Sequence, residues 1–259
     1  MKVLIIAPTN FQSYATAVLI KLLKDPDVEV VGVLVHAFNF SRLKNEFKRD
    51  GKRIFSKILN KAIFKEKKSM GYSFETPKKY LVQSKIKPNL KLLCDRNDVY
   101  YKKVSSFNGA ELIGDLTELK IDIGAFCGGG LLRDSFLDLF SIGVLNCHMG
   151  VLPMYRGMDV VEWPFLENDS TQVGVTCHLM DKGIDTGDIL EVVKVETANF
   201  ADFTGLREYL SGVMLELMIK TIISMKIGSF KRHRQLQSDG KQYFVMHPTL
   251  KKIAENKYR

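Results

Sequence analysis

The sequence lacks any long apolar run. No stretch of its 259 residues approaches the ~18 consecutive apolar residues that a transmembrane helix requires. The start, MKVLIIAP, also lacks the pattern of a secretory signal, because one lysine precedes only a short apolar run that Pro8 interrupts. We therefore expect residues 2–7 to form a buried strand and not an anchor or a cleaved leader.

Cysteine is scarce, and its spacing shows no disulfide framework. The four cysteines are Cys94, Cys127, Cys147 and Cys177. Three of them lie in apolar runs, which is typical of free, buried thiols in a reducing compartment, so we predict a cytoplasmic protein. Two Cys-His pairs occur, but neighbouring residues of a strand point to opposite faces, so each pair offers only one metal ligand. The sequence predicts no metal site.

Several common catalytic motifs are missing. There is no G-x-S-x-G elbow, which argues against a serine hydrolase of the α/β type, and no P-loop, which argues against that class of nucleotide hydrolase. Three consecutive glycines at 128–130 do not make a dinucleotide-binding fingerprint, because the third spaced glycine is absent. Internal repeats and low-complexity segments are also lacking.

What the chain does have is a strong charge asymmetry. The net charge is +9, yet residues 42–103 hold 19 lysines and arginines against 6 acidic residues, so the rest of the chain is net negative. A solvated surface is the ordinary explanation. The alternatives are attraction of a phosphate-bearing substrate, of nucleic acid, or of an anionic membrane on which a basic amphipathic helix at Phe55–Lys68 would rest weakly.

The apolar pattern predicts an α/β fold with a Rossmann-like, mostly parallel sheet. A basic insertion is expected over about 38–98, where Pro77 and Pro88 suggest irregular chain, and Ser13 is the expected N-cap of the first helix. Residues 1–225 would form the main domain and 226–259 a C-terminal tail or small subdomain. The expected strands are 2–7, 28–36, 99–104, 121–127, 143–146, a hairpin of 172–181 and 188–196, and a short strand or docked tail in 242–248; the expected helices are 13–25, 109–120, 133–140 and 203–225.

An Asn-x-His pattern ends one of the expected strands. Residues two apart in a strand point the same way, so Asn146 and His148 would project together at the edge where open α/β sheets bind ligands. The imidazole can accept a proton and the amide can donate to an oxyanion. Asp185, flanked by Gly183 and Gly187, is the best-placed carboxylate to join them. An isolated Asn-x-His pattern ordinarily has a structural role, so the surrounding sequence decides whether a catalytic role is favoured.

That context resembles a known family. The segments NCHMGVLPMYRG (146–157) and GVTCHLMDKGIDTGDIL (174–190) are similar to the formyltransferases that use N10-formyltetrahydrofolate. This family includes glycinamide ribonucleotide transformylase, methionyl-tRNA formyltransferase and the sugar N-formyltransferases. The resemblance is good over about 121–190 and looser over 1–36. It implies the formyltransferase fold, folate-dependent formyl transfer, and Asn146, His148 and Asp185 as the catalytic residues.

The same resemblance implies the binding residues. Those expected to contact the folate are Cys127, Gly128, Gly129, Gly130, Leu131, Leu132, Met180, Asp181, Gly183 and Ile184. Those expected to contact the other substrate are Asn10, Met149, Gly150, Tyr155, Arg156 and Gly157.

Within the family, the chain looks most like the sugar N-formyltransferases, which act on GDP- or dTDP-linked amino-dideoxy sugars for O-antigen and lipopolysaccharide synthesis. The first loop, APTNFQSYAT, has no glycine for a backbone phosphate cradle, which argues against glycinamide ribonucleotide. The tRNA enzymes carry an additional C-terminal domain, and the hydrolase branch an N-terminal one. Methionyl-tRNA formyltransferase, glycinamide ribonucleotide transformylase and a non-catalytic folate-binding module remain the alternatives. We expect no nucleic-acid partner, and helix 203–225 with the tail is a candidate dimer surface.

Overall fold

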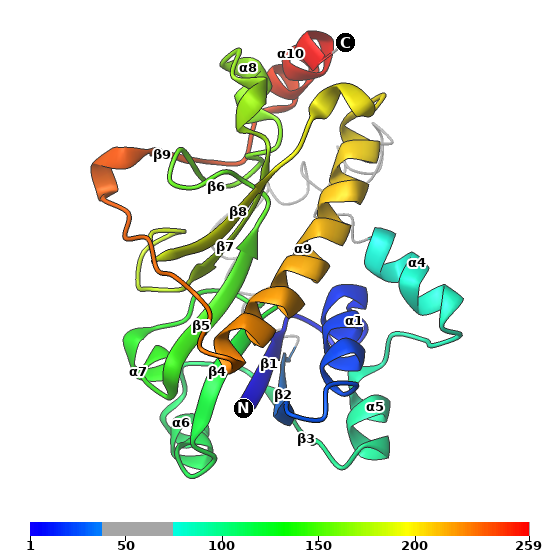
Figure 1. Cartoon of the computed structure of the whole chain (residues 1–259), viewed down its shortest axis with the longest axis vertical. Coiled ribbons are helices and arrows are strands. Elements are labelled where there is room, and N and C mark those ends of the chain that lie inside the picture. The colour runs from blue at the N-terminus through cyan, green and yellow to red at the C-terminus, as the bar shows by residue number, and fades with distance from the viewer. Residues whose placement is uncertain (38–74, 259) are drawn as a thin grey trace, which may run out of the picture.

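The computed structural model describes residues 1–37 and 75–258 (Figure 1). In this part of the chain, a seven-stranded sheet has the order β3-β2-β1-β4-β5-β7-β8. Strands β1 to β5 are parallel, whereas β7 and β8 are antiparallel to their neighbours, so the predicted mostly parallel α/β sheet is confirmed. The strands are β1 (Lys2–Ala7), β2 (Glu29–His36), β3 (Tyr100–Val104), β4 (Ile121–Phe126), β5 (Phe140–His148), β7 (Gly174–Leu179) and β8 (Ile189–Lys194).

The apolar run at 2–7 forms the central strand. β1 pairs with β2 on one side and with β4 on the other, and residues 3–7 have no exposed surface. A strand that is covered on both faces needs a continuous apolar run, which explains KVLIIA. The chain order changes direction between β1 and β4, which is the place where sheets of this type bind ligands at the carboxyl ends of their strands.

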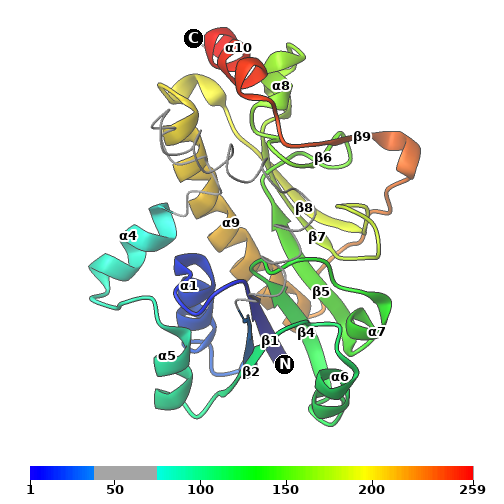
Figure 2. The same ribbon diagram turned by 180° about the vertical axis from the view of Figure 1, so that it is seen from behind.

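Helices cover both faces of the sheet (Figures 1 and 2). One buried cluster lies between the sheet and the helices α1 and α9, and a second lies under α6 and α7. α4 packs against α1 and α9, and α5 against α1, β2 and β3. These helices are α1 (Ser13–Leu22), α4 (Glu75–Gln83), α5 (Leu90–Arg96), α6 (Ala110–Thr117), α7 (Asp134–Leu137) and α9 (Phe203–Lys226). No helix in the described ranges has the length and apolar character needed to cross a bilayer.

Three local predictions need correction. Gln12, not Ser13, caps α1, because the Gln12 side chain accepts the amide hydrogen of Ala15. Pro77 lies in the first turn of α4, where a missing amide hydrogen costs nothing, and not in irregular chain. The helix expected at 133–140 is reduced to α7, because β5 begins at Phe140. β5 is correspondingly longer than the strand expected at 143–146.

The predicted basic insertion can be followed only in part. The amphipathic helix expected at Phe55–Lys68 lies outside the described residues. From residue 75 onwards the segment belongs to the α/β body, since Leu81, Leu90 and Cys94 are completely or almost completely buried.

A second, two-stranded sheet ties the tail to the body. β6 pairs with β9 in parallel, and the rings of Tyr155 and Tyr243 stack across this pair with centroids 5.2 Å apart. Of the segment 242–248, expected to be a short strand or a docked tail, only the first two residues belong to the strand β9. The remaining elements are β6 (Tyr155–Gly157), α8 (Trp163–Leu166), β9 (Lys241–Tyr243), α10 (Pro248–Tyr258) and the 3-10 turns Ser170–Gln172, Thr197–Asn199 and Gln237–Asp239.

Candidate active site

The register between β5 and β7 gathers polar side chains on one face of the sheet. Asn146 lies opposite His178, and His148 lies opposite Thr176. Directly opposed residues of an antiparallel pair share a face, so all four side chains project together. The intervening Cys147 faces the other way and is buried, as expected. The described cysteines are all free and buried, which confirms the prediction of buried thiols.

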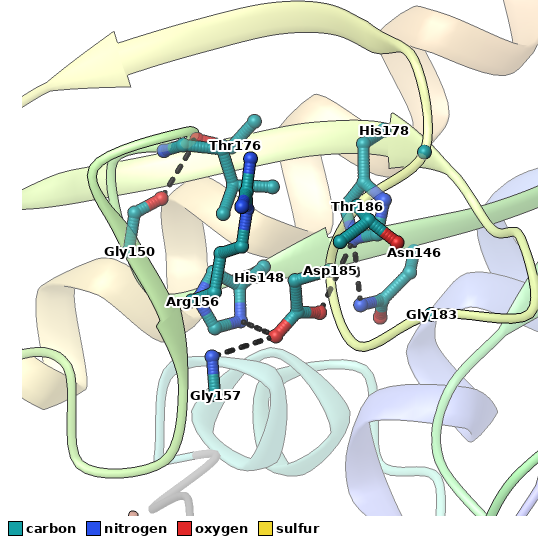
Figure 3. Close-up of polar contacts among 12 residues, drawn as sticks. Asn146, His148, Gly150, Arg156, Gly157, Thr176, His178, Gly183, Asp185 and Thr186 are labelled. Carbon is teal, nitrogen blue, oxygen red and sulfur yellow. Dashed lines mark hydrogen bonds and ion pairs between the residues drawn. The ribbon is translucent and has the colours of Figure 1, made fainter. Parts of the chain in front are cut away.

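Asp185 joins this group from the loop between β7 and β8 (Figure 3). The Asp185 carboxylate lies 3.5 Å from His148 Nδ1 through Oδ2 and 3.5 Å from His178 Nε2 through Oδ1. It also accepts the amide hydrogen of Gly157 at 2.9 Å. Asp185 has a φ of 54°, in the left-handed region that Asp tolerates better than most residues. The structure thus brings the three predicted catalytic residues together and adds a second histidine.

His178 fixes the orientation of Asn146. The carbonyl of Leu179 lies 2.8 Å from His178 Nδ1 and can only accept, so Nδ1 carries the proton. In the neutral ring His178 Nε2 is then an acceptor for the Asn146 amide at 3.1 Å, and in the protonated ring Nε2 donates to Asp185 Oδ1, 3.5 Å away. The neutral ring uses one amide hydrogen in this way, and no residue in the described part of the chain accepts the other. From sequence alone, His178 is a candidate only for metal binding, as half of a Cys-His pair. The alternation of GVTCH assigns it to one face of its strand but does not place it opposite Asn146.

Both nitrogens of His148 face acceptors. Nε2 lies 3.0 Å from the carbonyl of Tyr155, and Nδ1 faces Asp185. These contacts favour the imidazolium, whereas burial favours the neutral ring. Burial is the larger effect, and the pKa of His148 lies below its ordinary value despite the attraction of Asp185. The neutral ring carries its proton on Nε2, which faces a carbonyl, so Nδ1 has the lone pair and a proton taken up here lies between Nδ1 and the Asp185 carboxylate.

Asp185 is held in its charged form. Burial opposes the charge, but His148, His178 and the amide hydrogen of Gly157 outweigh it, and the pKa of Asp185 lies well below its ordinary value. The carboxylate therefore stays ionised at neutral pH. Its side chain keeps 14% of its surface exposed, against 4% for His148, so Asp185 is the more accessible member of the pair.

The loop after β5 supplies backbone groups to the site. The Thr176 hydroxyl donates to the Gly150 carbonyl at 2.7 Å and accepts the amide hydrogen of Leu152 at 3.1 Å, and the Leu152–Pro153 peptide bond is cis. Gly157 has a φ of +98°, and a Cβ there would collide with a backbone carbonyl of β9. The loop therefore requires glycine at position 157, where it meets β9.

The predicted substrate residues of this loop have inward side chains. Tyr155 and Arg156 are only 2% and 3% exposed, and Met149 belongs to the main buried cluster. The Asn10 side chain binds the backbone of Lys91 at 2.8 Å, with further contacts to Asn89 and Tyr101, and so ties the first loop to α5 and β3. Substrate contacts by these residues stay a prediction, and for the buried ones they would involve backbone atoms.

Two loops are predicted to contact the folate, one after β4 and one after β7, and the first has glycine backbone without side chains. Gly128, Gly129 and Gly130 have φ values of +115°, +135° and +108°, which side-chain-bearing residues rarely adopt. They follow β4, whose last residue pairs with Asn146. Asp181 holds the second loop together by accepting from Gly183 and Thr186.

The other residues expected to contact the folate differ in how exposed their side chains are. Leu131 is 73% exposed and Ile184 42%, while Cys127 and Leu132 are buried and Met180 is half-buried. Among the described residues, no group of His, Cys, Asp and Glu is arranged to hold a metal ion.

Comparisons with known proteins agree with this architecture. A family model described as formyl transferase matches residues 1–220. Methionyl-tRNA formyltransferase of Geobacter metallireducens is 27% identical over 154 residues, which are 59% of this chain and 49% of that protein, so the chain spans about half the length of the curated relatives it matches.

Two solved structures share the fold. A sugar N-formyltransferase from Shewanella sp. has a TM-score of 0.58 and 12% identity over 100% of this chain and 87% of that chain. An N-formyltransferase from Helicobacter canadensis, solved with folinic acid and dTDP-3-aminofucose, has a TM-score of 0.54 and 16% identity over 95% and 71% of the two chains.

Proposed function

The chain belongs to the formyl transferase family, and on this premise we propose that it transfers a formyl group from N10-formyltetrahydrofolate to the amine of a nucleotide-linked amino-dideoxy sugar. The observation that carries the proposal is the cluster of Asn146, His148, His178 and Asp185 on one face of the sheet. The fold shared with sugar N-formyltransferases supports the substrate class. The GDP- or dTDP-linked 4-amino-4,6-dideoxyhexoses of O-antigen and lipopolysaccharide synthesis are the specific candidates, and buried free thiols favour a cytoplasmic enzyme.

The residues divide the chemistry between them. When a substrate amine adds to a formyl carbon, negative charge develops on oxygen, and the free amide hydrogen of Asn146 is the donor for it. The amine must also lose a proton, and the bond between the formyl carbon and N10 must break, so that tetrahydrofolate leaves with a proton on N10. We assign the amine's proton to the pair of His148 and Asp185, reached directly or through water, because Nδ1 of His148 and the Asp185 carboxylate face each other at 3.5 Å.

The two loops beside this cluster fit a bound folate. N10-formyltetrahydrofolate supplies an activated one-carbon group when it is bound. The glycines at 128–130 offer backbone groups without side chains in the way, and Leu131 and Ile184 are exposed apolar side chains in the two loops. The backbone groups of the glycines would orient the pterin ring, and Leu131 and Ile184 would exclude water from the amine.

A methionyl-tRNA substrate is the second candidate, because the curated relatives carry that name. The two proposals differ in what binds. A tRNA would neutralise many lysines and arginines, so its affinity would fall steeply as salt rises, whereas a nucleotide sugar carries few charges.

The test is a substrate panel. Purified protein is incubated with N10-formyltetrahydrofolate and, separately, dTDP- and GDP-linked 4-amino sugars, initiator methionyl-tRNA and glycinamide ribonucleotide, and the change in folate absorbance is followed. Turnover with a nucleotide sugar alone is the expected result. Turnover with methionyl-tRNA alone contradicts the proposed substrate class, and folate binding without any turnover contradicts the proposed activity. Asn146→Ala, measured in parallel, shows whether turnover belongs to this site.

A further inference from the structure

Gln235 connects the candidate site to the segment that follows α9. This side chain is 8% exposed. Its Oε1 accepts from Arg156 Nε at 3.3 Å and from a second guanidinium nitrogen of Arg156 at 3.0 Å. Its Nε2 donates to the backbone carbonyl of Asp185 at 3.1 Å and to that of Gly187. All four hydrogen-bonding positions of the amide are thus occupied.

The contacts are matched to an amide and to no other side chain. One end meets a cation that can only donate, and the other end meets two carbonyls that can only accept. A glutamate would place a carboxylate against the carbonyls, and a leucine would leave both ends unpaired. Burial makes either mismatch costly, because unpaired polar groups lose water without a replacement.

The segment carrying Gln235 is itself anchored. His233 and Ile189 exchange two backbone hydrogen bonds of 2.8 and 2.9 Å at the start of β8, and Arg156 also donates to the carbonyl of Leu236 at 2.8 Å. The contacts of His233 and Leu236 therefore anchor the backbone before and after Gln235. Its amide reaches the loop at Asp185, whose left-handed backbone needs outside support.

We propose that Gln235 is a positioning residue, which holds the Asp185 loop so that the carboxylate meets His148. This assignment rests on the proposed function, because it takes the pair of His148 and Asp185 as the group that accepts the proton. It makes the segment after α9 part of the active site and not a separate tail. Gln235 acts through the backbone of Asp185 and Gly187 and touches no reacting atom.

The test compares two variants with a matched control. Gln235→Leu removes both sets of hydrogen bonds, and Gln235→Glu keeps the contact with Arg156 but turns an oxygen towards the carbonyls. The control is Gln242→Leu, a similar change at an exposed position in the same segment. Three readouts are taken for each protein: kcat and KM for formyl transfer, the melting temperature, and the NMR titration of the His148 ring.

For both Gln235 variants we expect kcat to fall about 10- to 100-fold with KM changed less than about threefold, since a displacement of ~1 Å in a catalytic group has an effect of this order. The pKa of His148 should fall, because Asp185 no longer supports its charged form. The control should match the wild type in all three readouts. If Gln235→Leu does not fold, Gln235→Glu carries the test, since it preserves size and the contact with Arg156.

A wild-type kcat in either folded variant overturns the assignment, and so does a loss of kcat with an unchanged His148 titration. The titration needs no substrate. If the wild-type protein proves inactive on every member of the panel, the proposed function fails, while the His148 titration still decides whether Gln235 positions Asp185.

Discussion

Replacing Asp185 by asparagine removes the negative charge between two histidines with almost no change of shape. At 3.5 Å and an effective dielectric constant of ~20, the attraction between a carboxylate and a protonated His148 is about 5 kcal/mol. The carboxylate is slightly exposed, so this value is an upper limit. In Asp185→Asn the pKa of His148 should therefore fall further below its ordinary value, because only the Tyr155 carbonyl then opposes the effect of burial.

The same change should slow catalysis. Each 1.4 kcal/mol is about tenfold in rate, so losing most of the attraction predicts a decrease in kcat of about 10²- to 10³-fold. Acid sensitivity should change as well. Because the pKa of Asp185 is depressed in the folded protein, its ionisation contributes stability above its unfolded pKa, and this contribution is lost as pH falls through the folded value. The asparagine variant should lack this component.

Histidine NMR and steady-state kinetics together test the reasoning. The ring signals of His148 are assigned with a His148→Gln variant and followed over the pH range in which each protein is folded. Asp188→Asn is the matched control: it removes a charge from the same loop, at a carboxylate that forms no ion pair with either histidine in the described part of the chain. Titration of His148 at the same pH in wild type and Asp185→Asn would refute the electrostatic argument.

Three further changes test other parts of the structure. His178→Ala removes the acceptor that orients Asn146, so kcat should fall about 10- to 100-fold, whereas a wild-type rate would show that this contact is dispensable. Gly157→Ala forces a side chain onto a φ of +98° and against β9, and urea unfolding should show a loss of about 2–4 kcal/mol; no loss contradicts the described β6–β9 contact. Glu162→Gln weakens the buried ion pair with Arg207, and a loss of about 3 kcal/mol, or roughly 10 °C in Tm by scanning fluorimetry, is expected; an unchanged Tm would show that the pair stabilises little.

The fold was largely predictable because its signals are local. Continuous apolar runs marked the buried strands, so the expectation of 121–127 matches β4 within one residue, and the helix expected at 203–225 ends one residue later. The errors came from positions where two signals competed. The strand expected at 143–146 corresponds to β5, but β5 begins at Phe140 and passes through Gly143 with a φ of +137°. A glycine inside a strand cannot be told from a boundary by sequence alone.

The sequence predicts which site residues share a face of one strand, but not which residues of different strands or loops meet. Two-residue alternation placed Asn146 and His148 together, and the same rule put His178 on one face of its own strand. Which residue His178 opposes depends on the register between β5 and β7, and a shift of one residue would have turned it to the core. Gln235 is harder still, because it is about fifty residues from Asp185 in sequence and its contact depends on a tail that crosses back to the start of β8. Local patterns therefore identify residues that can react, while the groups that orient them come from long-range pairing, and for this chain both His178 and Gln235 belong to that second kind.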